Sequence, residues 1–397
     1  MHVLKMLQKN AADALPEIHK VRLKGIFAAV QGLLTGRQLW LTALGRNLPG
    51  PVEEKHKIKR VDRLLDNPHL QWERLAVYQW LARFIIGSCQ RPLIVVDYAD
   101  LDDRKAVYVL RAAIPIGGRA IPIYELAVSR YNQPQDCARL LRDLKQVLPS
   151  DCRPILVTDA GFKAPWFRKV EEMGWYYIGR NLGRDYLQLP ASSEWISART
   201  LYASATRTPR ALGTLQIPRA TPLTTEAYLY RKPPRGRQRL TVQGQPRKSA
   251  QSLKRAHSER TPWLLLSNLP RRHKTAKQVV ELYRRRMSIE EGFRDLKAHR
   301  GGFALRQNLG RDPRRLSILL MVAAIATLCA WITGMAGINA EKHYALQANT
   351  ERRRNVLSVF TIGMRLIAQR MRVGMLAWRQ ATEKITALVL SECVATT

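Results

Sequence analysis

Four polar side chains recur at a helical spacing between residues 283 and 297. They are Tyr283, Arg286, Glu290 and Lys297, and at about 100° per residue they fall within about 60° of arc on one helix. Glu291 points elsewhere on this helix, so we predict that Glu290 reaches into a cleft and that Glu291 is a surface charge. A simpler interpretation also stays open, in which Arg286 and Glu290 form an ordinary i,i+4 ion pair.

Two aspartates supply further carboxylates. Asp97 follows the apolar run Leu93–Val96, and Asp159 follows the run Pro154–Thr158. If both runs are central parallel strands, both carboxylates emerge at the same edge of the sheet, where the ligand sites of open α/β sheets lie. Alternatively, each aspartate only caps the turn that follows its strand.

Three carboxylates from two strands and one helix are suited to metal-assisted chemistry at phosphorus. Carboxylates held close together repel one another and are normally neutralised by a divalent cation. Asp97, Asp159 and Glu290 would hold two Mg²⁺ ions, or Mn²⁺ in their place, on either side of a phosphodiester. Beside them, the Arg and Lys of the helix would bind phosphate oxygens, and its Tyr would donate a hydroxyl hydrogen bond.

The elements that must hold these residues follow from the apolar pattern. Between residues 92 and 179 the order is strand, hairpin, helix, strand, helix, strand, which predicts a mixed α/β sheet with helices on its faces. The hairpin joins Lys105–Ala113 to Ala120–Val128 through Gly117 and Gly118. Helical periodicity marks the segments 1–85, Asp136–Val147, Pro165–Met173, Lys274–Lys297 and Val356–Leu390.

On the expected single helix Lys274–Lys297, Asp295 falls on the solvent side.

Between about residues 183 and 262 the pattern is looser, and residues 201–260 hold 13 Lys and Arg against two Glu. A disordered linker is one interpretation of this segment. The alternating pieces Ala227–Tyr230 and Leu240–Val242 favour a basic β-rich insertion instead.

The charge of the chain points to a polyanionic partner. The 397 residues carry 66 Lys and Arg against 31 Asp and Glu, a net charge of +35. Nucleic acid is the partner that such an excess favours, with an anionic membrane surface as the alternative. The basic helix Lys55–Leu65 is either a solvated face or a surface that lies on phosphates. Leu316–Ala340 has 25 residues without a charge, as expected of a membrane span or of a buried core helix.

The compartment is indicated by the cysteines and the N-terminus. Five cysteines are scattered without a CxxC pair, which speaks against a disulfide framework or a zinc site and for a reducing compartment. The first residues lack the apolar core of a signal peptide. We therefore expect a cytoplasmic, nucleoid-associated protein and no membrane partner.

The three acids and the Tyr-x2-Arg-x3-Glu-x6-Lys spacing resemble the DDE transposases of bacterial cut-and-paste insertion sequences. The resemblance covers nearly the whole chain, in particular the segments Leu44–Pro49, Ile58–Leu65, Glu73–Tyr78, Val157–Trp166, Ile289–Lys297 and Gln347–Ser358. It implies a ribonuclease-H-like mixed sheet with a β-rich insertion, flanked by helical N- and C-terminal regions. It also implies cleavage through a DNA hairpin at the inverted-repeat ends of double-stranded DNA, joining to target DNA, and a homodimer in a synaptic complex.

The same resemblance implies five segments. They are a helical DNA-binding region at 1–88, the first part of the core at 89–182, the insertion at 183–262, the remainder of the core with Glu290 at 263–305, and a helical dimerisation region at 306–397. In relatives a Trp of the insertion receives a flipped base, and Trp263 matches its neighbourhood, although a Trp that begins an apolar strand is also a normal core residue. Met287 stands where some relatives have a second Trp, so hairpin stabilisation would differ in detail.

Two other functional classes remain open. A catalytically silent DNA-binding protein, such as a domesticated transposase or repressor, would share the charge and the fold. A polybasic membrane-associated protein would explain the charge and the apolar segment, but it leaves the three acids unexplained.

Overall fold

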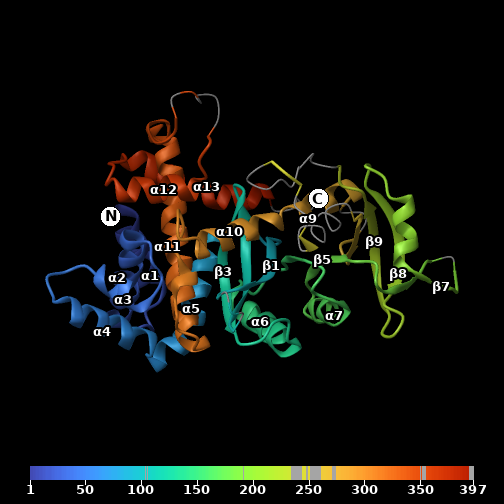
Figure 1. Ribbon diagram of the computed structural model, residues 1–397, viewed down its shortest axis with the longest axis horizontal. Helices are drawn as coiled ribbons and strands as arrows, with labels where there is room; N and C mark the ends of the chain where they lie inside the picture. Colours follow the sequence, from blue (N-terminus) through green and yellow to red (C-terminus); the bar gives the residue numbers. More distant parts are fainter. Residues whose placement is uncertain are drawn as a thin grey trace. The chain divides into compact units, whose positions relative to one another are not determined.

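The structure is a computed structural model that describes the chain except residues 103, 105, 191, 234–243, 247–248, 251–260, 271–273, 349, 351–354 and 393–397. The chain divides into two compact units. Unit 1 comprises Met1–Pro154 and Arg286–Ala395, and unit 2 is built from Ile155–Arg285. Figure 1 shows the elements of both units in sequence colours.

Unit 1 contains an antiparallel sheet of three strands in the order β3-β2-β1. The strands are β1 (Leu93–Asp100), β2 (Tyr108–Ile116) and β3 (Arg119–Val128). Gly117 and Gly118 both have positive φ between β2 and β3, which is the backbone that a two-residue hairpin turn needs. The predicted hairpin is therefore confirmed.

The two faces of this sheet are covered by different helices. Tyr124 on β3 packs edge-on against Tyr78 of α5 (Pro68–Ile86) and donates a hydrogen bond to Asp143 of α6 (Pro134–Val147). The next residue, Glu125, points to the opposite face because successive side chains of a strand alternate. On that face, α10 (Met287–Lys297) packs against all three strands.

The remaining helices of unit 1 come from both ends of the chain. The N-terminal ones are α1 (His2–Ala14), α2 (Lys20–Gly36), α3 (Leu41–Arg46) and α4 (Glu54–Leu65), and the C-terminal ones are α11 (Pro313–Asn339), α12 (Val359–Ala368) and α13 (Met375–Glu392). Local signals in the sequence mark the start of α5. The Asn67 side chain accepts from the backbone N–H groups of His69 and Leu70, and Pro68 takes the first helical position of α5.

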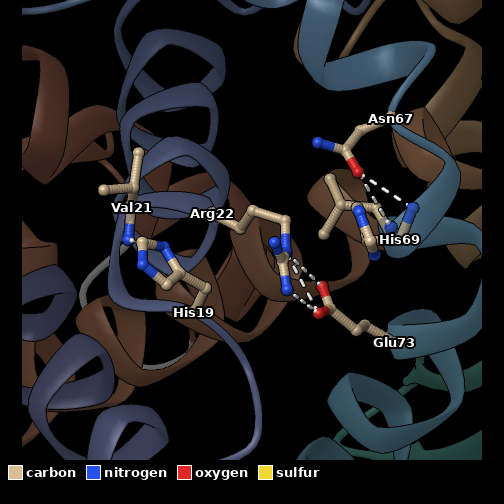
Figure 2. Close-up of polar contacts among 7 residues, drawn as sticks. His19, Val21, Arg22, Asn67, His69 and Glu73 are labelled. Atoms are coloured by element: carbon tan, nitrogen blue, oxygen red, sulfur yellow. Dashed lines mark hydrogen bonds and ion pairs between the residues drawn. The ribbon is translucent and has the colours of Figure 1, made fainter.

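An ion pair joins two of the N-terminal helices. Arg22 of α2 donates from Nε to both carboxylate oxygens of Glu73 on α5, at 3.0 and 2.9 Å (Figure 2). Both side chains are partly buried, with 24% and 15% of their surface exposed. The pair joins α2 to α5.

The long apolar segment is a core helix of unit 1. Of the 18-residue window in α11 that is apolar enough to cross a membrane, 94% is buried inside the protein. The helix contacts α2, α5, α12, α13 and β3. Its approach to α12 is very close, because a Cβ at Gly363 would collide with the carbonyl oxygen of Ala330. The buried-helix interpretation of Leu316–Ala340 therefore accounts for its composition.

Unit 2 holds a mixed sheet in the order β4-β5-β10-β9-β8-β6-β7. The strands are β4 (Ile155–Thr158), β5 (Tyr176–Asn181), β6 (Tyr186–Gln188), β7 (Trp195–Ser197), β8 (Arg210–Ile217), β9 (Leu223–Tyr230) and β10 (Trp263–Ser267). β4 and β5 are parallel, and the other pairs are antiparallel. Helices α7 (Ala164–Glu172) and α9 (Ala276–Arg284) belong to the same unit.

The fold class is confirmed as mixed α/β, consistent with a ribonuclease-H-like core. The strands β6 to β9 fall in the expected β-rich insertion, and Ala227–Tyr230 lies in β9. The other expected piece, Leu240–Val242, lies outside the described residues. The five segment boundaries expected from the family resemblance stay predictions.

The cysteines agree with the sequence prediction at three positions and disagree at one. Cys137, Cys152 and Cys329 are free and buried. Cys89 is disulfide-bonded, which differs from the expectation of a chain without disulfides.

Candidate active site

The predicted single helix over 274–297 is two helices. α9 begins with a capping box, in which Thr275 and Gln278 bond to each other's backbone N–H, and it ends at Arg284. α10 starts at Met287. The break at Arg285 and Arg286 is also the boundary between the two units, so Tyr283 belongs to unit 2 and the other three residues of the spacing belong to unit 1. The prediction of one continuous helix was wrong.

Arg286 connects two of the three predicted acids. Its Nη1 lies 3.0 Å from Oδ2 of Asp97, and its Nη2 lies 3.0 Å from Oε1 of Glu290. The i,i+4 pair with Glu290 is therefore present, and the same guanidinium also reaches strand β1. Arg286 and Asp97 are each 14% exposed, whereas Glu290 is 49% exposed. The acid from the strand and the acid from the helix thus share one cation.

Asp97 lies inside its strand and not at the end of it. β1 continues to Asp100, so the predicted position at a strand end was wrong for this residue. Oδ1 of Asp97 accepts the backbone N–H of Tyr98 at 2.8 Å. The second oxygen, Oδ2, is the one that meets Arg286.

The ammonium of Lys297 lies at the end of β1, beside Asp100, which is not among the acids singled out from the sequence. Its Nζ is 3.3 Å from the carbonyl oxygen of Asp100 and 3.6 Å from Oδ1 of the same residue. Arg306 approaches the other carboxylate oxygen at 3.3 Å. Burial lowers the pKa of the Lys297 ammonium, an effect that Asp100 partly offsets and Arg306 adds to. The site therefore includes Asp100 and Arg306, for which the sequence pattern gave no signal.

The two adjacent glutamates bind different arginines. Glu291 pairs with Arg119 at 3.4 Å and with Arg294, and it is 35% exposed. Asp295 accepts from Nε of Arg119 at 2.7 Å and is 14% exposed, so its predicted position on the solvent side was wrong. Glu290 is 49% exposed and Glu291 is 35% exposed, so the prediction that Glu291 is the surface charge of the two was wrong. Separate roles for them are nonetheless supported, because Glu291 and Asp295 hold α10 to the β2–β3 hairpin through Arg119.

Asp159 follows β4 directly, as the sequence predicted. Its Oδ1 accepts the backbone N–H of Gly161 at 2.8 Å, which is the turn-capping contact of the simpler interpretation. The residue belongs to unit 2, and its approach to Asp97 and Glu290 stays a prediction.

Tyr283 and Trp263 form an aromatic cluster within unit 2. Their ring centroids are 4.9 Å apart in an edge-on contact, and Tyr230 meets Trp263 on β10 at 5.7 Å. Tyr283 is 3% and Trp263 is 7% exposed. This burial supports the core role that a Trp at the start of an apolar strand normally has.

Met287 is the most accessible of the predicted DNA-contacting side chains. It is 45% exposed, and its sulfur lies 3.5 Å from Nη2 of Arg286. The side chain therefore lies next to the Arg286 guanidinium, at the start of α10.

The donor set suits hard divalent cations. Carboxylate oxygens are the ligands that Mg²⁺ and Mn²⁺ prefer, and in unit 1 the carboxylates of Asp97 and Glu290 both contact the guanidinium of Arg286. Within the described parts of the chain, no group of three or more His, Cys, Asp or Glu side chains is close enough to hold a metal ion. The third predicted ligand, Asp159, belongs to unit 2, and its part in a metal site stays a prediction.

Comparison with known proteins identifies the family. No curated protein matches the chain. Residues 99–329 match the family described as the transposase DDE domain, and this match covers more than half of the chain. Asp159 and Glu290 lie inside the matched range, and Asp97 lies two residues before it. The chain therefore belongs to the DDE transposases of insertion sequences.

Proposed function

We propose that this transposase is a cut-and-paste enzyme of the group with the Tyr-Arg-Glu-Lys signature, similar to the transposase of the tetracycline-resistance composite transposon. Asp97, Asp159 and Glu290 are its metal-binding acids. The observation that carries the proposal is the bridge of Arg286 between Asp97 and Glu290. Two carboxylates 193 positions apart in sequence are brought to one cation within unit 1, together with side chains suited to phosphate.

The proposed reaction is a series of displacements at phosphorus. Water attacks a phosphodiester at the end of the element, the bond to the 3′ oxygen breaks, and a 3′-OH is released. That hydroxyl attacks the phosphodiester at the same end of the opposite strand, which closes a hairpin and expels the 3′-OH of the flanking DNA. A second water attacks the hairpin phosphodiester and expels the 3′-OH of the element again. This 3′-OH finally attacks a phosphodiester of target DNA and expels a target 3′-OH. Bound Mg²⁺ ions, which the family generally uses, would activate each attacking hydroxyl and stabilise each leaving oxygen.

The side chains of unit 1 bind and orient the substrate in this scheme. Arg286 already touches both acids, so a phosphate oxygen beside them is within reach of its fork of donors. Lys297 is held at the end of β1 by Asp100 and adds a point charge. Tyr283, Trp263 and Met287 stay predicted DNA contacts, although the burial of the two aromatic residues favours a structural role for them.

A basic face of α4 supports DNA binding outside the site. Val61 and Leu65 are buried, whereas Lys55, Lys59 and Arg63, spaced four residues apart, are exposed. This arrangement combines the two interpretations of the segment, because one side of the helix packs on the core and the other is a solvated basic stripe. We propose that the stripe contacts phosphates of the double-stranded DNA ends, and that the protein acts as a homodimer in the bacterial cytoplasm, associated with the nucleoid.

Cleavage of a labelled duplex tests the proposal. The duplex is taken from the DNA that flanks the reading frame and is incubated with Mg²⁺ or with EDTA. We expect Mg²⁺-dependent double-strand breaks with a hairpin product from the wild type and none from Glu290→Gln. Glu291→Gln is the matched control, because it changes the adjacent carboxylate, whose partners are Arg119 and Arg294.

Binding without cleavage would contradict the proposal. If the wild type binds these ends and never cuts them, the chain is a catalytically silent DNA-binding protein. If Glu290→Gln cuts as fast as Glu291→Gln, the assignment of Glu290 as a metal-binding acid is wrong.

A further inference from the structure

A row of three charged side chains crosses the sheet of unit 1. Asp97 on β1 lies opposite Arg111 on β2, and Arg111 lies opposite Glu125 on β3. Directly opposite residues of antiparallel strands point to the same face of the sheet. An acid, a base and an acid therefore alternate across the face that α10 covers.

The inner two residues of this row are a fully buried ion pair. Arg111 is 2% exposed and Glu125 is 0% exposed, and Nε and Nη2 of Arg111 each lie 2.8 Å from Oε1 of Glu125. Arg74, which is also buried, donates from Nη1 to the backbone carbonyl of Glu125 at 2.9 Å. In the described part of the chain Glu125 Oε2 has no hydrogen-bond partner. Because apolar residues of similar volume would avoid the cost of burying two charges, stability alone does not explain this pair.

Arg111 is also the point where α10 meets the sheet. Its guanidinium carbon lies 4.4 Å from the centre of the Phe293 ring. A Cβ at Gly292 would lie 3.3 Å from Nη1 of Arg111 and 3.0 Å from the carbonyl oxygen of Ala120, so the helix backbone itself approaches the strands here. Phe293 follows Glu290 by three residues, which is about one helical turn. The flat guanidinium thus limits the height and rotation of the turn that carries Glu290.

We infer that Arg111, oriented by Glu125, is a positioning residue that fixes Glu290 against Asp97. The inference rests on the proposed function, since it concerns the two acids proposed to bind metal. Arg111 is the cross-strand neighbour of one acid and contacts the helix turn of the other. A displacement of about 1 Å between such groups lowers the rate of the chemical step by about 100-fold.

Two replacements separate positioning from simple stabilisation. Arg111→Met with Glu125→Leu substitutes apolar side chains for the buried pair. Arg111→Lys keeps the charge and loses the planar contact with Phe293. The matched control is Arg22→Met with Glu73→Leu, which removes the partly buried ion pair between α2 and α5 of the same unit (Figure 2). Thermal unfolding and binding of the flanking duplex establish that each variant folds.

The first measurement needs no catalytic activity. Amide hydrogen exchange is followed across residues 287–297 of the DNA-free protein. We expect exchange in α10 to accelerate by about tenfold or more in Arg111→Met with Glu125→Leu, because the helix loses the contact of Phe293 with the Arg111 guanidinium on the sheet. Exchange in this segment should stay at the wild-type rate in the Arg22 and Glu73 control.

The second measurement is single-turnover cleavage at saturating DNA with Mg²⁺. We expect the rate to fall by about 100-fold in the apolar double variant, while the Kd for the duplex stays within about twofold of the wild type. Arg111→Lys should cut at an intermediate rate. The control double variant should lose stability without losing rate.

A folded apolar double variant that cuts at the wild-type rate would overturn the inference. If that variant does not fold, Arg111→Lys tests the inference instead. A wild-type cleavage rate in Arg111→Lys would show that the planar contact with Phe293 is not needed, and it would also overturn the inference. The Glu290→Gln variant tests the proposed function independently. If this variant cuts at the wild-type rate, Glu290 is not a metal-binding acid. In that case the exchange of α10 still reports whether Arg111 fixes the helix.

Discussion

The bridge of Arg286 predicts two coupling energies of different size. The perturbations are Arg286→Gln, Asp97→Asn and Glu290→Gln, singly and in the two pairs that include Arg286. The free energy of unfolding is measured by urea denaturation in EDTA, so that no metal contributes. A double-mutant cycle then isolates each contact from the other interactions of the three residues.

The burial of the three side chains sets the magnitudes. Arg286 and Asp97 meet at 3.0 Å with 14% of each side chain exposed, which is typical of a charge-assisted hydrogen bond worth about 2 kcal/mol. Glu290 meets the same guanidinium at 3.0 Å but is 49% exposed, so water screens the pair and we expect about 0.4 kcal/mol, as for surface i,i+4 pairs. Equal distances should thus give couplings that differ by about fivefold.

Added salt sharpens this test. Raising the ionic strength should weaken the coupling of Arg286 to Glu290 more than that to Asp97, because a partly buried pair is less screened. A coupling to Glu290 as large as that to Asp97, or no coupling to Asp97 at all, would refute the reasoning from burial. It would also mean that Arg286 does not hold the two acids together.

Three further results are expected. Gly363→Ala should lower the free energy of unfolding by about 2 kcal/mol, because its Cβ collides with the carbonyl oxygen of Ala330. At Gly310 the atom nearest to an added Cβ belongs to Asn308, at 3.5 Å, so Gly310→Ala should stay within about 0.5 kcal/mol of the wild type. Equal changes of the two variants in denaturant unfolding would contradict the close packing at Gly363. Burial raises the pKa of Cys152 to about 12, and Asp151 adds a smaller effect. The rate of alkylation of Cys152, measured by mass spectrometry of the labelled peptide, should therefore still rise between pH 9 and 11. A plateau of this rate near pH 9 would contradict the burial. Affinity for the flanking duplex should fall steeply with salt, with a log–log slope of about −0.9 for each phosphate neutralised, and a flat titration would show that the basic surface does not bind DNA.

Local patterns predicted most of the elements. The hairpin was visible because Gly117 and Gly118 separate two apolar runs, and both adopt the positive φ that the turn requires. The strand before Asp159 was equally clear, because Pro154–Thr158 is a short apolar run that ends in an acid. In each case the information lies within about ten residues of sequence.

The errors come from contacts between distant segments. Nothing in Arg284, Arg285 and Arg286 disfavours a helix, yet the helix ends there at the boundary between the units. Asp295 was placed in solvent by helical periodicity, but Arg119, 176 residues away, covers it. A single sequence does not reveal such partners.

The buried pair of Arg111 and Glu125 was missed for a related reason. Charged residues are almost never fully buried unless they are paired, so a strand position with Arg or Glu reads as solvent-facing. The signal becomes visible only when the register places the two residues opposite each other. Asp100 and Arg306 became apparent in the same way, because Asp100 contacts Lys297 and Arg306 contacts Asp100.

A change of metal preference tests most directly whether Asp97 binds the metal. Asp97→Cys replaces a hard carboxylate by a softer thiolate, which Mn²⁺ accepts better than Mg²⁺ does. We predict that this variant loses about 100-fold in single-turnover cleavage with Mg²⁺ and recovers at least about tenfold with Mn²⁺. Asp100→Cys, which changes the neighbouring acid of β1, should keep the wild-type ratio of the two rates. A folded Asp97→Cys protein that cuts with Mg²⁺ at the wild-type rate would contradict the assignment of Asp97 as a metal ligand.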